Sequence, residues 1–153
     1  LDVMGRIYDI TEYSTALKPF ALHRLLDMGY RKVFYVDPDL YFTGSIEDAS
    51  QALDDHDCVL TPHILTPLPL DDRHPTTKDL LAAGIYNLGF IGLSHKCQAA
   101  LSAWGNWVET HASKSVWNHE FTDQRWADFF PSILKSFVWR DPGANVAYWN
   151  LHE

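Results

Sequence analysis

Hydrophobic and polar residues follow two periods along the chain, and the changes of period predict its elements. Between Ser14 and Met28 apolar residues recur at helical spacing, and Gly29 follows as a helix stop. Pro19 belongs in a first turn, so the helix is expected to begin near Lys18 or to kink there. The next apolar run, 33–36, is β-branched and aromatic throughout, which is typical of a strand covered on both faces.

The same two periods predict an alternation of helices and strands over the rest of the chain. Helices are expected at 45–53, 79–83, 97–112 and 123–130, and strands at 40–42, 58–61, 85–93 and 137–139. Pro131 is expected to end the last helix. Residues 62–79 hold four prolines and predict a long irregular loop. This alternation favours an α/β fold with a mainly parallel sheet.

Composition excludes several classes of function. The 153 residues suffice for one core, and 46% apolar with 21% charged residues is a globular composition. A net charge of −8 argues against nucleic acid as a partner, since such proteins carry a basic face. No apolar run approaches the roughly 18 residues of a transmembrane helix. Cys58 and Cys97 form no disulfide or zinc pattern, so we expect a reducing, cytoplasmic compartment.

Two carboxylates stand where the first predicted strand ends. Asp37 and Asp39 flank Pro38, which disfavours helix at Asp37 and keeps that residue extended. In an extended chain residues i and i+2 point the same way, so both carboxylates can serve one hard cation such as Mg²⁺ or Mn²⁺. Open α/β sheets bind ligands at this end of their strands. The alternative is an ordinary turn in which each aspartate bonds its own backbone.

Four stretches, taken in order, resemble a known family. They are LKPFAL (17–22), YVDPDL (35–40), IYNLGFIGL (85–93) and FTDQRW (121–126). Together they resemble the glycogenin-like (family 8) retaining glycosyltransferases and related bacterial glycosyltransferases of the GT-A fold, over residues 14–152. The resemblance implies a GT-A-like sheet flanked by helices. It also implies metal-dependent transfer of a sugar, with retention, from a nucleotide-sugar donor, UDP-linked by expectation, to a carbohydrate or glycoconjugate acceptor.

The resemblance further implies roles for single residues. The implied ligands of a Mn²⁺ or Mg²⁺ ion are Asp37, Asp39 and His152. The implied donor-binding residues are Lys18, Asp37, Asn87 and Gly89. The implied catalytic pair, beside the transferred sugar, is Asp123 and Gln124.

These residue types also suit sugar transfer on physical grounds. A leaving diphosphate gathers negative charge, which a divalent cation and Lys18 can stabilise. The sugar passes through an oxocarbenium-like state that oxygens of Asp123 and Gln124 can stabilise. A carboxylate nucleophile and same-face attack by the acceptor are both compatible with this set. Asn87, in an apolar strand, either bonds local backbone or faces a ligand.

Two other functions stay open. Nucleotidyltransferases also place paired carboxylates on Mg²⁺ at a strand end, although their Gly-rich basic phosphate loop is not visible early in this chain. A non-catalytic carbohydrate-binding domain of the same fold is the third reading. Only 36 residues precede Asp37, fewer than the fold normally uses to hold a nucleotide base. The single domain over 1–153 is therefore expected to be N-terminally truncated and, alone, to bind donor poorly or not at all.

Overall fold

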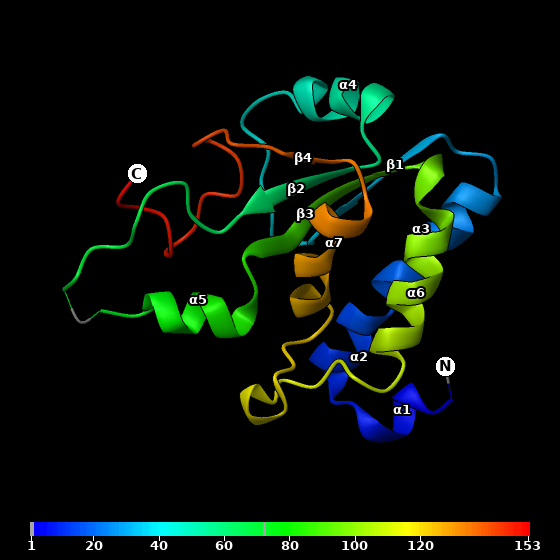
Figure 1. Ribbon diagram of the computed structural model, residues 1–153, viewed down its shortest axis with the longest axis horizontal. Helices are drawn as coiled ribbons and strands as arrows, with labels where there is room; N and C mark the ends of the chain where they lie inside the picture. Colours follow the sequence, from blue (N-terminus) through cyan, green and yellow to red (C-terminus); the bar gives the residue numbers. More distant parts are fainter. Residues whose placement is uncertain (1, 72) are drawn as a thin grey trace.

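The structure, a computed structural model, describes residues 2–71 and 73–153 (Figure 1). Its α-helices are α1 (Met4–Ile7), α2 (Ile10–Ala16), α3 (Lys18–Asp27), α4 (Glu47–Asp55), α5 (Thr77–Ala83), α6 (Gln98–Val108) and α7 (Phe130–Ile133). Its strands are β1 (Lys32–Val36), β2 (Cys58–Pro62), β3 (Tyr86–Ser94) and β4 (Ser136–Val138). Three 3₁₀-helices are η1 (His95–Cys97), η2 (Val116–Asn118) and η3 (Gln124–Phe129).

The four strands form one mixed sheet in the order β1–β3–β2–β4. β3 runs antiparallel to both β1 and β2, and only β2 and β4 are parallel. The expected α/β composition is confirmed, but the expected mainly parallel sheet is wrong. A parallel neighbour needs a crossover, usually a helix packed on the sheet. The helix between β2 and β3 is α5, which buries no residue, so the chain returns antiparallel beside β2.

β1 lies at an edge of this sheet, paired among the described residues only with β3. Of its five residues Val33 alone is buried, and the others are half-buried. Both faces of this edge strand nevertheless touch a core, which confirms the expected strand covered on both faces: Val33 and Tyr35 pack on one side, Phe34 and Val36 on the other.

Two hydrophobic clusters sandwich the sheet. In Figure 1, α4 lies on one side of the sheet, and α3 and α6 lie on the other. The larger holds the buried faces of α3 and α6 together with Trp104 and Phe130, whose rings meet edge to face at 5.4 Å. The smaller lies under α4, where Ala49 and Leu53 pack against Val59 and Phe90. The sheet is thus the middle of three layers, and both of its faces are occupied along most of their length.

Several boundaries differ from the sequence prediction for local reasons. The expected helix from Ser14 to Met28 is two helices, because Asp9 starts α2 with a capping box and Pro19 occupies the first turn of α3. Gly29 has φ 96° after α3, the left-handed stop expected there. Residues 40–42 form no strand. Pro131 does not end a helix but sits in the first turn of α7.

Among the residues that the structure describes, no helix is both long and apolar enough to cross a membrane. Cys58 and Cys97 are buried free thiols. Burial raises the pKa of Cys58 to about 11 and that of Cys97 to about 12. Both thiols therefore stay protonated at neutral pH.

Candidate functional site

The site begins with an irregularity in β3. Leu60 of β2 pairs with Ile91, but its neighbour Thr61 pairs with Asn87, so residues 88–90 have no partner in β2. We call residues 88–90 the β3 bulge. On the other side β1 stays in register: Val36 lies opposite Phe90, and the Asp37 N–H donates to the Gly89 carbonyl at 2.7 Å. Bulges are frequent beside active sites because they re-aim side chains and backbone.

Three polar side chains, two of them from distant segments, bond the backbone of the β3 bulge. The Lys18 ammonium donates to the Leu88 carbonyl at 3.0 Å, and the Leu88 N–H donates to Gln124 Oε1 at 3.1 Å. The Gly89 N–H donates to Asn87 Oδ1 at 2.7 Å. A buried backbone group without a partner is costly, so these polar side chains are what allow β3 to leave its ladder.

A buried charge cluster lies behind the bulge. Lys18 Nζ is 3.2 Å from Asp123 Oδ2 and 3.7 Å from Asp37 Oδ1. The Lys18 and Asp123 side chains are 3% and 1% exposed, against 35% for Asp37. The contact between Lys18 and Asp123 Oδ2 is an ion pair, and this oxygen has no other polar partner among the described residues. Burial raises the pKa of Asp123, and the Lys18 charge opposes that rise.

Tyr35 completes the surroundings of Asp37. Its hydroxyl donates to Asp37 Oδ1 at 2.6 Å, and its ring lies 4.4 Å from Lys18 Nζ. Burial, followed by the adjacent Asp37 carboxylate, raises the pKa of Tyr35. The hydroxyl therefore remains a donor at any physiological pH, and it fixes one oxygen of Asp37. Because Oδ1 is held in this way, Oδ2 is the Asp37 oxygen left for a ligand.

Asn87 is oriented from both ends of its amide. Oδ1 accepts from the Gly89 N–H, while Nδ2 lies 3.3 Å from His63 Nε2. His63 Nδ1 lies 3.2 Å from the Ile85 carbonyl, which assigns the proton to Nδ1 and makes Nε2 the acceptor. Burial lowers the pKa of His63, in keeping with a neutral ring. Asn87 was expected either to bond local backbone or to face a ligand. The bond to local backbone is present, at the Gly89 N–H.

Gly89 makes room for the carboxyl end of β1. A Cβ at this position would lie 2.7 Å from Asn87 Oδ1 and 3.2 Å from Asp37 Oδ2. The first separation is shorter than real Cβ contacts, so any side chain would displace Asn87 or the bulge. Glycine is thus needed to bring the β3 backbone against Asp37.

The three predicted metal ligands are not brought together. Asp39 is exposed next to Asp37, whereas the His152 ring lies 3.4 Å from the Thr66 carbonyl and 3.8 Å from Glu153. Within residues 2–71 and 73–153 no three His, Cys, Asp or Glu side chains form a metal-binding group. The oxygen set of Asp37 and Asp39 still suits Mg²⁺ or Mn²⁺, which often take one or two carboxylates and complete their shell with water and phosphate. Ligation by His152 stays a prediction.

The predicted catalytic pair is close to the site but turned inward. Asp123 faces Lys18, and the two ends of the Gln124 amide bond the Leu88 N–H and, at 3.0 Å, the Ala83 carbonyl. The Trp104 indole donates to the Asp123 carbonyl at 3.1 Å. Gln124 therefore holds the bulge directly, and Asp123 is buried against Lys18, which bonds the bulge.

Sequence reasoning missed two contributors. Tyr35 stands two residues before Asp37, and strand periodicity puts the two side chains on one face, so the signal was present. Thr61, whose hydroxyl donates to the Asn87 carbonyl at 3.1 Å, was indistinguishable from any strand threonine. Only the register shift between β2 and β3 makes its role visible.

Searches among protein-family models, curated proteins and solved structures find no match to this chain.

Proposed function

We propose that this chain carries the donor site of a metal-dependent glycosyltransferase that moves a sugar from a nucleotide-sugar donor, UDP-linked, to a carbohydrate acceptor with retention. One observation carries the proposal. Three of the four stretches that carry the resemblance contribute Lys18, Asp37 and Gln124. Each of these residues bonds the β3 bulge, which belongs to the fourth stretch, and Lys18 also pairs with Asp37. If these residues served only in a helix, a turn or the core, their four stretches would not need to contact one another.

In this proposal Asp37 and Asp39 supply the oxygens for a Mg²⁺ or Mn²⁺ ion. When bound, that ion stabilises negative charge on the leaving diphosphate. Tyr35 and Lys18 hold Asp37 Oδ1, so that the remaining oxygen is presented in one orientation. Such preorganisation saves the cost of ordering a surface carboxylate when the donor arrives.

Asn87 and Gly89 form the floor beside the sugar. An amide nitrogen has two N–H groups, and His63 takes one, so the second can donate to a sugar hydroxyl. Glycine at position 89 leaves the space that the Asn87 amide oxygen and the Asp37 carboxylate occupy, so both groups are held against the bulge. These contacts hold the ring where its anomeric carbon meets the diphosphate oxygen.

Two routes lead to retention: attack by a carboxylate nucleophile, or attack by the acceptor on the same face as the departing diphosphate. The burial of Asp123 favours the second. A carboxylate that is 1% exposed and faces an ammonium group cannot reach an anomeric carbon without unfolding its surroundings. The proposal therefore takes same-face attack, in which the bond to the diphosphate oxygen breaks while the acceptor oxygen bonds the anomeric carbon. The hydroxyl proton passes to the departing phosphate. Asp123 and Gln124 then act by positioning Lys18 and Leu88.

The test is release of UDP from a panel of UDP-sugars in the presence of Mn²⁺. Asp37→Asn and Asp39→Asn should each abolish metal-dependent release with the fold intact by circular dichroism. Asp55→Asn, which removes an exposed carboxylate at the end of α4, should leave the rate unchanged. Full activity in either site variant, or activity that persists in a chelator, would contradict the proposal.

A further inference from the structure

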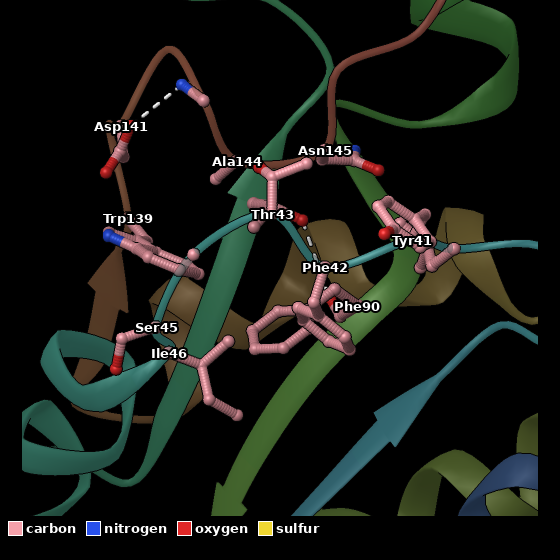
Figure 2. A pocket seen from close by; sticks show the side chains of 14 residues that line it. Tyr41, Phe42, Thr43, Ser45, Ile46, Phe90, Trp139, Asp141, Ala144 and Asn145 are labelled. Atoms are coloured by element: carbon pink, nitrogen blue, oxygen red, sulfur yellow. Dashed lines mark hydrogen bonds between the residues drawn. The ribbon is translucent and has the colours of Figure 1, made fainter.

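A hollow lies beside the candidate donor site, between residues 40–46 and residues 139–145 (Figure 2). We call it the aromatic hollow. Its volume is about 200 Å³, the size of a site for one small ring rather than for a nucleotide. The first segment follows Asp39 directly, and the second follows β4. No role was assigned to this place by the sequence or by the proposed function.

Aromatic rings form its walls. Phe42 and Phe90 meet edge to face with centroids 6.5 Å apart, and Trp139 lies 5.6 Å from Phe90. Figure 2 shows the Trp139 ring on one side of the hollow and the Phe42–Phe90 pair on the other. Phe42 is half exposed and Tyr41 is 87% exposed, so large apolar surfaces stay in contact with water. Aromatic faces are electron-rich and favour C–H groups presented edge-on.

Polar groups stand at the end of the hollow formed by residues 141–145. The Asn145 Nδ2 atom is buried, yet it donates to no acceptor in the described part of the chain. Asp141 Oδ1 accepts from the Gly143 N–H at 2.7 Å, which holds the carboxylate and leaves Oδ2 without a donor among the described residues. An amide donor and a carboxylate acceptor in the same lining match the hydroxyl groups of a ligand, which both accept and donate.

The charge of the lining excludes anions. Its residues include Asp141 but no Lys, Arg or His. Cationic side chains are common partners of phosphate groups, so this lining favours an uncharged ligand over a nucleotide or phosphosugar. An uncharged ring with C–H faces and hydroxyl edges fits both the aromatic walls and the polar end.

We propose that the aromatic hollow binds one uncharged sugar ring. Its place next to the donor site makes it the subsite for the acceptor sugar, an assignment that rests on the proposed function. The two sites share residues: Leu40 lines the hollow and lies 3.5 Å from where a Gly89 Cβ would be. Thr61 likewise lines the hollow and bonds the Asn87 carbonyl. A ring in the hollow therefore abuts the β3 bulge.

The experiment is saturation-transfer NMR and calorimetry with methyl glycosides of glucose, galactose and mannose, on the full chain without metal or nucleotide. At least one glycoside should bind. Asn145→Gly should weaken it about tenfold, because it removes one buried hydrogen bond. Asn145 has φ 61°, so glycine keeps the backbone as it is. Trp139→Ala should weaken binding about as much, since it removes a wall of the hollow.

The control is Trp117→Ala, which removes a 91% exposed ring that does not line the hollow and should leave the affinity unchanged. Three results would overturn the inference: no glycoside binds, affinity is unchanged in both hollow variants, or uridine competes for the hollow in place of the sugar. Binding of UDP with Mn²⁺ is measured separately on the same protein. If UDP binds and glycosides do not, the inference that the hollow binds a sugar fails and the proposed function is unaffected. If glycosides bind and UDP does not, the hollow is a sugar site, but its assignment to the acceptor is contradicted.

Discussion

The ammonium group of Lys18 lies 3.2 Å from the carboxylate of Asp123, and both side chains are almost completely buried. Removing one partner of such a pair leaves an uncompensated buried charge. We therefore expect Lys18→Met to lower the free energy of unfolding by about 3–5 kcal/mol. Asp123→Asn in the same chain should recover a large part of that loss, because the two charges disappear together. Urea unfolding of both single variants and the double variant measures the coupling.

The matched control for this cycle is the exposed pair of Lys114 and Asp9, whose side chains are 42% and 52% exposed. Lys114→Met should change the free energy of unfolding by less than about 1 kcal/mol. If Lys18→Met were as mild as Lys114→Met, Lys18 would not be the internal charge that supports the bulge.

Gly89→Ala should destabilise the protein, since the new Cβ would lie 2.7 Å from Asn87 Oδ1. We expect a loss of about 1–3 kcal/mol, as for other overpacked positions. Gly44→Ala serves as the control, because a Cβ there would meet nothing within 4 Å. Thermal unfolding of the two variants compares them directly. Equal melting temperatures would show that the bulge tolerates a side chain.

Gln124→Ala should leave the Leu88 N–H and the Ala83 carbonyl without their side-chain partner. The expected cost is about 1–3 kcal/mol, the range for buried groups left unsatisfied. Gln124→Glu keeps an acceptor for the Leu88 N–H but places a carboxylate oxygen against the Ala83 carbonyl, so it should not restore the lost stability. Under the proposed function, Gln124→Ala also lowers the rate of sugar transfer much more than the affinity for UDP. Equal losses of both would make Gln124 a binding residue.

His63 gives the fold a pH dependence of defined sign. Burial lowers the pKa of His63 below its ordinary value of about 6.5. As the pH falls below about 6.5 the unfolded chain takes up a proton on this histidine before the folded chain does, so stability declines until the lowered folded pKa is passed. His63→Gln should flatten this part of the stability profile, which begins at about pH 6.5 and extends to lower pH. Urea unfolding at several pH values tests it, and an unchanged slope would exclude His63 as the cause.

Part of this architecture was readable from the sequence because it depends on local rules. The helix that ends at Gly29, the strand that ends at Asp37 and the strand beginning near Tyr86 follow from apolar period and stop signals. The order of the strands did not follow. Antiparallel return of β3 depends on α5 staying off the sheet, and nothing in residues 77–83 reports that.

The candidate site divides in the same way. The resemblance pointed to Lys18, Asp37, Asn87 and Gln124, and the structure brings all four to the β3 bulge. Their orientation could not be predicted, because it depends on a three-residue shift between β2 and β3 that leaves no mark on either strand's hydrophobic pattern. For the same reason Asp123 and Gln124 were expected to face a sugar and instead face the backbone and Lys18.

The most direct test of the account is calorimetric titration of UDP into the 153-residue chain with and without Mn²⁺. We predict binding that requires Mn²⁺, is abolished by Asp39→Asn, and is unaffected by Asp55→Asn. Absence of Mn²⁺-dependent UDP binding, or tight binding of a nucleoside triphosphate without UDP binding, would contradict the claim that the carboxyl end of β1 and the β3 bulge form a nucleotide-sugar site.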